Sequence, residues 1–425
     1  MNDDLATQRL TRRALLTGAG GLAASAAVGR LGGRSSAPSA PPRLQRMAPA
    51  ALGSAVATRE LHLCGTDGWV SMPAGAPADA PFYPDSLAPA PYDTYVFGFR
   101  DATGMAAADI GSLKGHAQIS APMLSFDQET DIKVTLSNLG LQQRPDLTDG
   151  HTLHWHGFQN AIPLFDGVPE LSMSIPIGRE FTYFYRPHDP GTYMYHCHFE
   201  DVEHVQMGMT GMLFVRPIQN AGSGSVPPGQ YVYNDGDGHT GYDREFGFML
   251  TELWSAAHYR DAHIQVSDWT DYHPSFWLLN GRGYPDTIAP NGNPRSTDTG
   301  TDRLHYQPIS SLVTANSGDR VLLRLANLGY ENHAMTLDGI QLRVVGKDST
   351  LLKDPYTTGT VDLGPGESRD VIFTAPDVGS TTTFLLYDRN YSFASNGGGK
   401  GYGGQMTEVR ISPPGTVPAQ TAPNS

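Results

Sequence analysis

Cysteine and charge are both scarce in this 425-residue chain. Its two cysteines, Cys64 and Cys197, could form one disulfide with each other, which is the simplest expectation for an exported protein. Charged residues make up 17% of the chain, and 29 basic against 43 acidic side chains leave a formal charge of −14. This acidic balance argues against nucleic acid or an anionic membrane surface as a partner.

Long apolar runs are also missing. The Gly- and Ala-rich stretch that follows Thr11-Arg12-Arg13 and ends at Val28 has only about fifteen weakly apolar residues, too few to span a bilayer. It resembles a twin-arginine signal, with small-residue cleavage sites near Ala26. We therefore expect residues 1–30 to be a signal peptide. The mature protein is then periplasmic or extracellular, with no stable membrane insertion.

Glycine and proline are abundant, with 48 and 32 residues, and favour turn-rich β structure. Alternating segments at 95–99, 132–136, 181–185 and 212–216 predict strands, and the chain length suits two domains. The predicted organisation is a disordered linker at 31–55, a first domain at 56–220, a linker at 221–229, a second domain at 230–413 and a disordered tail at 414–425.

The segment around Cys197 carries the strongest chemical signal. His196 and His198 flank the cysteine, and His204 and Met209 follow. Side chains alternate along an extended strand, so the two flanking histidines would share one face while Cys197 points to the other. A thiolate, two imidazoles and a weak thioether are the ligands of a blue-copper electron-transfer site.

A second histidine motif lies upstream, at His151, His154 and His156. The last two have the same parity and would project to one side, whereas His151 can turn towards Cys197. The alternative, that these are ordinary core histidines, would require six coincidences. We predict one metal site formed by His151, Cys197, His204 and Met209, and a second lined by His154, His156, His196 and His198.

These motifs, H-x-x-H-x-H-G and H-C-H with the spaced His and Met, resemble the copper-ligand motifs of the laccase-like multicopper oxidases. The resemblance covers about residues 110 to 412 and includes the segments 166–169 and 190–195. It implies cupredoxin domains and a type 1 copper that accepts electrons from a substrate. The flanking histidines would pass the electrons to a trinuclear copper cluster that reduces dioxygen to water. It also implies that His204 is the ligand nearest the surface, and that two-domain members form homotrimers.

The chain contains an internal repeat. Residues 131–140 match 319–329 to within one residue, and 175–182 match 363–370. Two copies of one antiparallel sandwich of the Greek-key cupredoxin type explain this pattern, so the predicted fold is all-β with two tandem domains.

The second copy lacks most of the histidines. The positions that match His154, His156, His196 and His198 hold Thr336, Asp338, Tyr387 and Arg389. His333 matches His151, and we expect it to be a hydrogen-bonded structural residue. A trinuclear cluster needs about eight imidazoles, and the first domain offers four. Arg389 cannot replace a missing ligand, because its guanidinium cannot ligate copper and repels it. Asp338 could bind a metal or pair with Arg389. We therefore predict an incomplete or remodelled cluster.

The sequence thus predicts an exported copper oxidoreductase that takes single electrons from a small reductant, such as a phenol, at His204. Cys197 would pass them to His196 and His198, with dioxygen as a candidate acceptor. The four paired histidines would either hold one or two further coppers or remain as relics. A non-enzymatic blue-copper electron carrier or copper-binding protein is the alternative. If Cys197 binds copper, Cys64 is left as a free, buried thiol.

Overall fold

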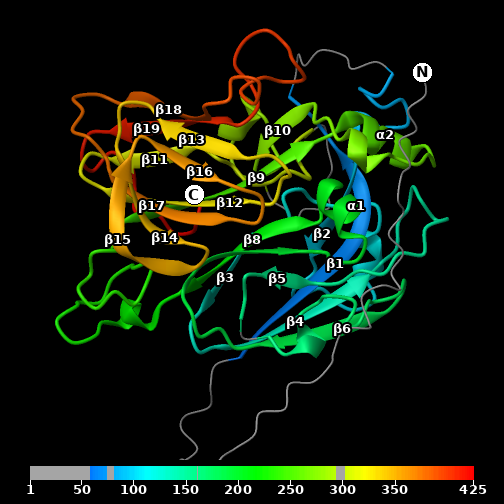
Figure 1. Cartoon of the computed structure of the whole chain (residues 1–425), viewed down its shortest axis with the longest axis horizontal. Coiled ribbons are helices and arrows are strands. Elements are labelled where there is room, and N and C mark those ends of the chain that lie inside the picture. The colour runs from blue at the N-terminus through cyan, green and yellow to red at the C-terminus, as the bar shows by residue number, and fades with distance from the viewer. Residues whose placement is uncertain (1–57, 74–80, 160, 293–301) are drawn as a thin grey trace, which may run out of the picture. The chain divides into compact units, whose positions relative to one another are not determined.

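Strands form nearly all of the regular structure in residues 58–73, 81–159, 161–292 and 302–425, which the computed structural model describes (Figure 1). The expected signal peptide at 1–30 and linker at 31–55 lie outside these ranges. The strands form four sheets, two in the first half of the described chain and two in the second. The predicted all-β class is therefore confirmed.

The first sandwich consists of two four-stranded sheets that share one core. Along the third strand of the first sheet, Ile132, Val134 and Leu136 are buried while Lys133 is exposed, the alternation expected of a strand with one covered face. In order, the first sheet contains β2 (Thr94–Asp101), β1 (Thr58–Val70), β4 (Asp131–Asn138) and β6 (Glu180–Tyr185), and the second contains β3 (Leu124–Asp127), β8 (Thr210–Arg216), β7 (Gly191–His196) and β5 (His154–His156).

The second sandwich has a six-stranded and a five-stranded sheet around a separate core. The six-stranded sheet runs β10 (Phe276–Leu279), β9 (Arg244–Leu253), β12 (Arg320–Asn327), β17 (Ser368–Thr374), β14 (Leu342–Lys347) and β15 (Thr350–Thr358). The five-stranded sheet runs β11 (Val313–Asn316), β19 (Met406–Ser412), β18 (Thr382–Asp388), β13 (His333–Leu337) and β16 (Thr360–Leu363).

Helices are short and few in the described ranges. The α-helices are α1 (Asp201–Gln206) and α2 (Ser255–Ala262), and none of the described helices is long and apolar enough to cross a membrane. The single-turn 3₁₀ segments are η1 (Ile110–Leu113), η2 (Pro163–Phe165), η3 (Ile218–Ala221), η4 (Trp269–Asp271) and η5 (Asp286–Ile288).

The two sandwiches repeat the same strand pairing. In the first, β4 lies between a parallel partner, β1, and an antiparallel partner, β6; in the second, β12 lies between parallel β9 and antiparallel β17. Asn138 ends β4 and Asn327 ends β12, and each side-chain oxygen accepts a hydrogen bond of 2.8 Å from the glycine two residues later. The repeat read from the sequence is thus present in the backbone geometry as well.

A buried polar network joins strand β7 to the second sandwich. The guanidinium of Arg324 is fully buried, lies 3.2 Å from Glu245 and 3.3 Å from Asp370, and donates to the hydroxyl of Thr192 on β7 (3.0 Å). The hydroxyl of Ser368 donates to the carbonyl of Thr192 (2.8 Å). β7 leads directly into the His-Cys-His segment, so this network fixes one end of the strand that positions it.

The C-terminal segment at 414–425, expected to be a disordered tail, is mostly exposed but is anchored near its end by hydrogen bonds of Asn424. Asn424 is buried, and its side-chain amide donates to the carbonyls of Gly247 (2.9 Å) and Ser310 (2.8 Å). Gly247 in turn donates its backbone N–H to the Asn424 side-chain oxygen (2.8 Å). The polar, Pro-rich composition suggested disorder, but Asn424 forms hydrogen bonds with Gly247 of strand β9.

Candidate metal centres

The predicted thiolate site is assembled and buried. The Sγ atom of Cys197 lies 3.2 Å from Nδ1 of His204 and 3.9 Å from Nδ1 of His151, and their ligand atoms lie within 4.8 Å of one another. Met209, the predicted thioether ligand, is fully buried in the same core. Four residues spread over 59 positions of the sequence therefore meet in one place.

Three different elements bring these residues together. His151 forms an isolated antiparallel bridge with Ile175 just before β5, and Cys197 directly follows β7. His204 lies in helix α1. The backbone N–H of Cys197 donates to the carbonyl of Met209 (3.2 Å), which ties the two ends of the motif together.

Gly65 on β1 leaves room for this cluster. A Cβ atom at that position would lie 2.6 Å from the ring of His151 and 3.2 Å from the terminal methyl of Met209. Real Cβ contacts of 2.6 Å do not occur, so any side chain here would push the His151 ring away from the thiol. The sequence analysis did not identify this glycine as a site residue.

The electrostatics of the cluster favour a thiolate. Burial by itself raises the pKa of Cys197, but the positive charge of His204 and the hydrogen bonds of both imidazoles outweigh burial and bring the pKa well below its ordinary value. The Thr152 N–H also donates to the sulfur (3.4 Å). A thiolate is the form of cysteine that ligates metal.

His204, expected to be the ligand nearest the surface, is itself enclosed by its neighbours. Its side chain is 0% exposed, with the rings of Phe97 and Phe199 centred 5.6 Å and 6.0 Å from its own. Nε2 of His204 has no hydrogen-bond partner and lies 3.7 Å from a carboxylate oxygen of Asp149. Glu200 joins them within 4.8 Å. The acidic residues near His204 could have been noticed in the sequence, but their convergence on its ring could not.

The predicted four-histidine site is also assembled. His154 pairs directly with His196 across β5 and β7, and their ring centroids are 5.2 Å apart. His198 lies 5.2 Å from His154, and His156 lies 5.8 Å from His196, again between ring centroids. Ligand nitrogens of His154, His156 and His196 come within 4.8 Å of one another. The strand parity argument therefore placed these rings correctly on one side.

Hydrogen bonds and burial prepare these imidazoles as neutral ligands. Nδ1–H of His154 donates to the carbonyl of Asp166 (2.6 Å), and Nδ1–H of His196 donates to the carbonyl of Cys197 (2.8 Å), which leaves both Nε2 lone pairs free. Burial, together with repulsion from the neighbouring imidazoles, lowers the pKa of His196 to about 3. Burial also lowers the pKa values of His154 and His156. At neutral pH these three rings are uncharged, as metal binding requires.

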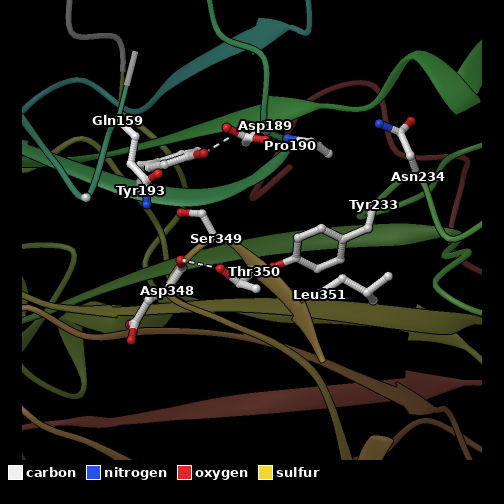
Figure 2. Close-up of a pocket in the computed structure, with 11 residues that line it drawn as sticks. Gln159, Asp189, Pro190, Tyr193, Tyr233, Asn234, Asp348, Ser349, Thr350 and Leu351 are labelled. Atoms are coloured by element: carbon white, nitrogen blue, oxygen red, sulfur yellow. Dashed lines mark hydrogen bonds between the residues drawn. The ribbon is translucent and has the colours of Figure 1, made fainter. Parts of the chain in front are cut away.

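A cleft between the two sandwiches leads to this histidine cluster. Figure 2 shows one pocket of this cleft, where Tyr193 and Asp189 face Tyr233, Ser349 and Thr350. Its volume is about 330 Å³. A neighbouring pocket of about 230 Å³ shares Tyr193, Asp348 and Ser349 with it, and His156 is among the residues that line it. One of the four histidines, His156, therefore lines a cavity.

The second sandwich has no matching histidine cluster in its described residues. Tyr387 pairs with Thr336 across β13 and β18, as His196 pairs with His154 in the first. The hydroxyl of Tyr387 donates to Asp338 (3.1 Å), and Arg389 donates to Thr360 (3.3 Å). An Asp338–Arg389 ion pair, one of the two alternatives for Asp338, is absent from the described contacts.

His333 is a structural histidine, as predicted. Its Nδ1 lies 2.9 Å from Asp388 and its Nε2 lies 2.6 Å from Glu252, and all three side chains are fully or almost fully buried. Asp388 follows Tyr387 just as Cys197 follows His196, so an Asp–His pair stands where the first sandwich has its Cys–His pair. The alignment of the two repeats places Asp388 opposite Cys197, so its position beside His333 could have been predicted. Glu252 comes from a distant strand and was missed.

Both cysteines are free thiols buried in the core, so a disulfide between them is excluded. Burial, followed by the nearby carboxylates Asp101 and Glu180, raises the pKa of Cys64 to about 12. Cys64 is therefore an inert thiol, in contrast to Cys197.

Comparisons with known proteins agree with this architecture. Two family models described as multicopper oxidase match residues 115–220 and 245–402. The chain is 27% identical over 241 residues to an L-ascorbate oxidase of Cucurbita pepo var. melopepo, which covers 53% of this chain and 39% of that protein. It is 33% identical over 177 residues to Laccase-1 of Emericella nidulans, and that match covers 40% of this chain and 27% of Laccase-1. The crystal structure of a blue copper oxidase from Nitrosomonas europaea superposes with a TM-score of 0.60 at 23% identity, covering 83% of this chain and 86% of that one.

The chain is thus built from tandem cupredoxin-type sandwiches, a fold that it shares with the Nitrosomonas europaea structure. It belongs to the multicopper oxidase family, whose members bind copper. It spans less than half of the length of the curated relatives it matches.

Proposed function

We propose that this protein is a copper-dependent oxidoreductase that takes single electrons at a type 1 copper. One observation carries the proposal: in a single buried cluster, a thiol with a lowered pKa faces ring nitrogens of two histidines at 3.2 and 3.9 Å. The structural histidine of the second sandwich, His333, points both of its nitrogens at carboxylate oxygens instead. His151, Cys197 and His204, with Met209 as weak thioether, are the donor set that suits a blue-copper ion.

A copper ion bound by these residues supplies one-electron exchange. The chain's own part is to exclude water, to hold the sulfur and to connect the two sites. Cys197 and the two histidines that flank it are consecutive residues, so a short covalent path joins the thiolate to the four-histidine cluster. The carbonyl of Cys197 also accepts the hydrogen bond from His196 (2.8 Å). We assign these three residues and His204 to electron transfer.

We further propose that the second site holds one or two copper ions and is not a complete trinuclear cluster. Its four histidines all come from the first sandwich, and the matching positions of the second hold Thr336, Asp338, Tyr387 and Arg389. A small oxidant such as dioxygen, reaching His156 through the cleft, is the proposed acceptor. Four-electron reduction of dioxygen would require ligands from elsewhere. A homotrimer, and export by the twin-arginine route to the periplasm or exterior, complete the proposal.

The loss of histidines in the second sandwich favours one alternative, a blue-copper electron carrier or copper-binding protein without turnover. In that case the four histidines are held only by hydrogen bonds such as those of His154 and His196. Both functions require the thiolate site, and they differ only in the occupancy of the second one.

Copper content and the electron paramagnetic resonance spectrum of copper-loaded protein test the proposal. Two or three coppers per chain, with a small and a normal parallel hyperfine splitting, together with turnover of a phenol under air, support the oxidoreductase. One copper with only the small splitting supports the carrier. Protein that binds copper without a thiolate-to-copper colour would contradict both, and a Cys197→Ser variant provides the colourless reference.

A further inference from the structure

A methionine lies beside the four-histidine cluster. Met194 is directly opposite His156 in the β5–β7 pair, and it precedes His196 by two residues on the same face of β7. Residues directly opposite each other in an antiparallel pair have Cβ atoms about 4.5 to 5.5 Å apart. The thioether of Met194 is therefore an immediate neighbour of the imidazoles.

Met194 is the first of a row of buried methionines between the two sandwiches. Met212 pairs with it across β7 and β8, and both belong to one core cluster against which Met123 packs. A Cβ atom on Gly247 would lie 2.7 Å from the sulfur of Met212 and 2.7 Å from the terminal methyl of Met123. Of these three methionines, Met194 is the one that lines the pocket of about 230 Å³ together with His156.

The chemistry of a thioether differs from that of an alkyl side chain of the same size. Leucine would fill the space of Met194 about equally well, but it has no sulfur that peroxide can convert to a sulfoxide. The side chain of Met194 is only 2% exposed, so oxidants in bulk solvent have little access to it. A peroxide released into the pocket has direct access, and the pocket has room for the added oxygen atom.

From this placement we propose that Met194 is a peroxide-reactive site, whose thioether intercepts hydrogen peroxide formed at the four-histidine cluster and becomes methionine sulfoxide. The inference rests on the proposed function, in which the second site is an incomplete cluster with dioxygen as acceptor. Reduction by two electrons stops at peroxide. Its removal at Met194 protects the neighbouring imidazoles and the thiolate of Cys197, three residues further along the chain.

The step balances without any further reactant. Two electrons from the reductant and two protons convert dioxygen to hydrogen peroxide. The sulfur of Met194 then attacks one peroxide oxygen, so that the O–O bond breaks and an S–O bond forms. The sulfur is oxidised by two electrons, and the second oxygen leaves as water with both protons.

Peptide mass spectrometry after turnover tests the site. Copper-loaded protein would oxidise hydroquinone in air, with catalase present to remove peroxide from the solution. We expect sulfoxide at Met194 in excess of that at Met173, which is 52% exposed and reports on bulk peroxide. Metal-free protein treated with hydrogen peroxide should show the reverse order, with Met173 oxidised about tenfold faster or more because of its exposure. Sulfoxide at Met173 equal to or above that at Met194 during turnover would overturn the proposal.

The protective role has its own readout in the blue colour. Met194→Leu keeps the volume but lacks the sulfur, so its thiolate-to-copper band should fade severalfold faster during turnover than that of wild type. Met212→Leu is the matched control, because Met212 belongs to the same buried group and is not among the residues that line the pocket; its band should last as long as that of wild type. Equal lifetimes for Met194→Leu and wild type would refute protection.

Failure of the proposed function gives a different result. A protein that forms no blue colour, or that consumes no oxygen, would contradict the copper oxidoreductase rather than the reactive methionine. Peroxide added to metal-free protein then decides the site, because Met194 and Met212 are equally buried and differ in their access to the pocket. Oxidation of Met194 ahead of Met212 supports a peroxide-reactive site, and equal rates for the two overturn it.

Discussion

Replacing His333 by glutamine should destabilise the second sandwich in a pH-dependent way. Burial alone lowers the pKa of His333, but its hydrogen bonds to Asp388 and Glu252 outweigh burial and raise the pKa to about 9, from an ordinary 6.5. The folded protein therefore favours the protonated ring, held between two buried carboxylates. Glutamine can donate one hydrogen bond at this position but carries no charge.

The size of the effect follows from the pKa shift. A group whose pKa is raised on folding contributes its full stability below the unfolded pKa and loses it as the pH rises through the folded value. For His333 this contribution is about 3 kcal/mol below pH 6.5, and it disappears as the pH passes about 9. The stability difference between wild type and His333→Gln should therefore narrow by about 3 kcal/mol over that window.

Urea unfolding of metal-free protein, followed by tryptophan fluorescence at several pH values, measures this difference. Trp277 is a suitable reporter, because it stacks on Phe393 (ring centroids 4.9 Å apart) and Phe393 contacts the His333 ring (5.5 Å). The matched control is His188→Gln, which removes a half-exposed histidine from Glu129 and should cost less than about 1 kcal/mol at any pH. A wild-type to His333→Gln difference that is equal at pH 6 and pH 10 would refute a protonated His333.

Three further outcomes are expected. Gly65→Ala should weaken or abolish the blue copper band, because the added Cβ would lie 2.6 Å from the His151 ring. The control variant Gly111→Ala, where the added Cβ would meet open space, should leave the band intact. Arg324→Met should lower the free energy of unfolding by about 3 to 5 kcal/mol, since buried Asp370 loses the guanidinium that it faces, while Glu245 retains its ion pair with Arg216. A loss below about 1 kcal/mol in urea unfolding would contradict that account. Cys64 should stay unmodified by a thiol reagent in the native, copper-loaded protein and react only on unfolding; rapid native labelling of Cys64, identified by mass spectrometry, would show that the thiol is accessible.

Much of both candidate metal sites could be predicted because their geometry is local. His196, Cys197 and His198 are consecutive, so strand alternation alone separates the thiol from the two imidazoles. The repeat was equally visible, because Asn138 and Asn327 end equivalent strands and make the same turn contact. The absence of the four histidines from the second sandwich could be seen by comparing the two copies of the repeat residue by residue.

Other features could not be predicted because they depend on contacts between distant segments. Glu252 meets His333 from 81 residues away, on a strand whose pairing the sequence did not reveal. The burial of His204 depends on Phe97, on a strand of the opposite sheet, and on a helix turn that begins at Glu200 in a left-handed conformation (φ +45°). The order of the C-terminal segment likewise comes from side-chain contacts with β9.

The sequence by itself determined which residues could bind copper and on which side of its strand each one lies. It also determined that the second copy of the repeat lacks four of the matching histidines. These properties follow from residue chemistry and from the period of an extended chain. Tertiary structure alone decided that His204 is enclosed, that carboxylates gather at its outer edge, and that a carboxylate–histidine–carboxylate group replaces the metal site in the second sandwich. Each of these depends on how two packed sandwiches bring remote segments within a few ångströms, and no local pattern in the sequence encodes that distance.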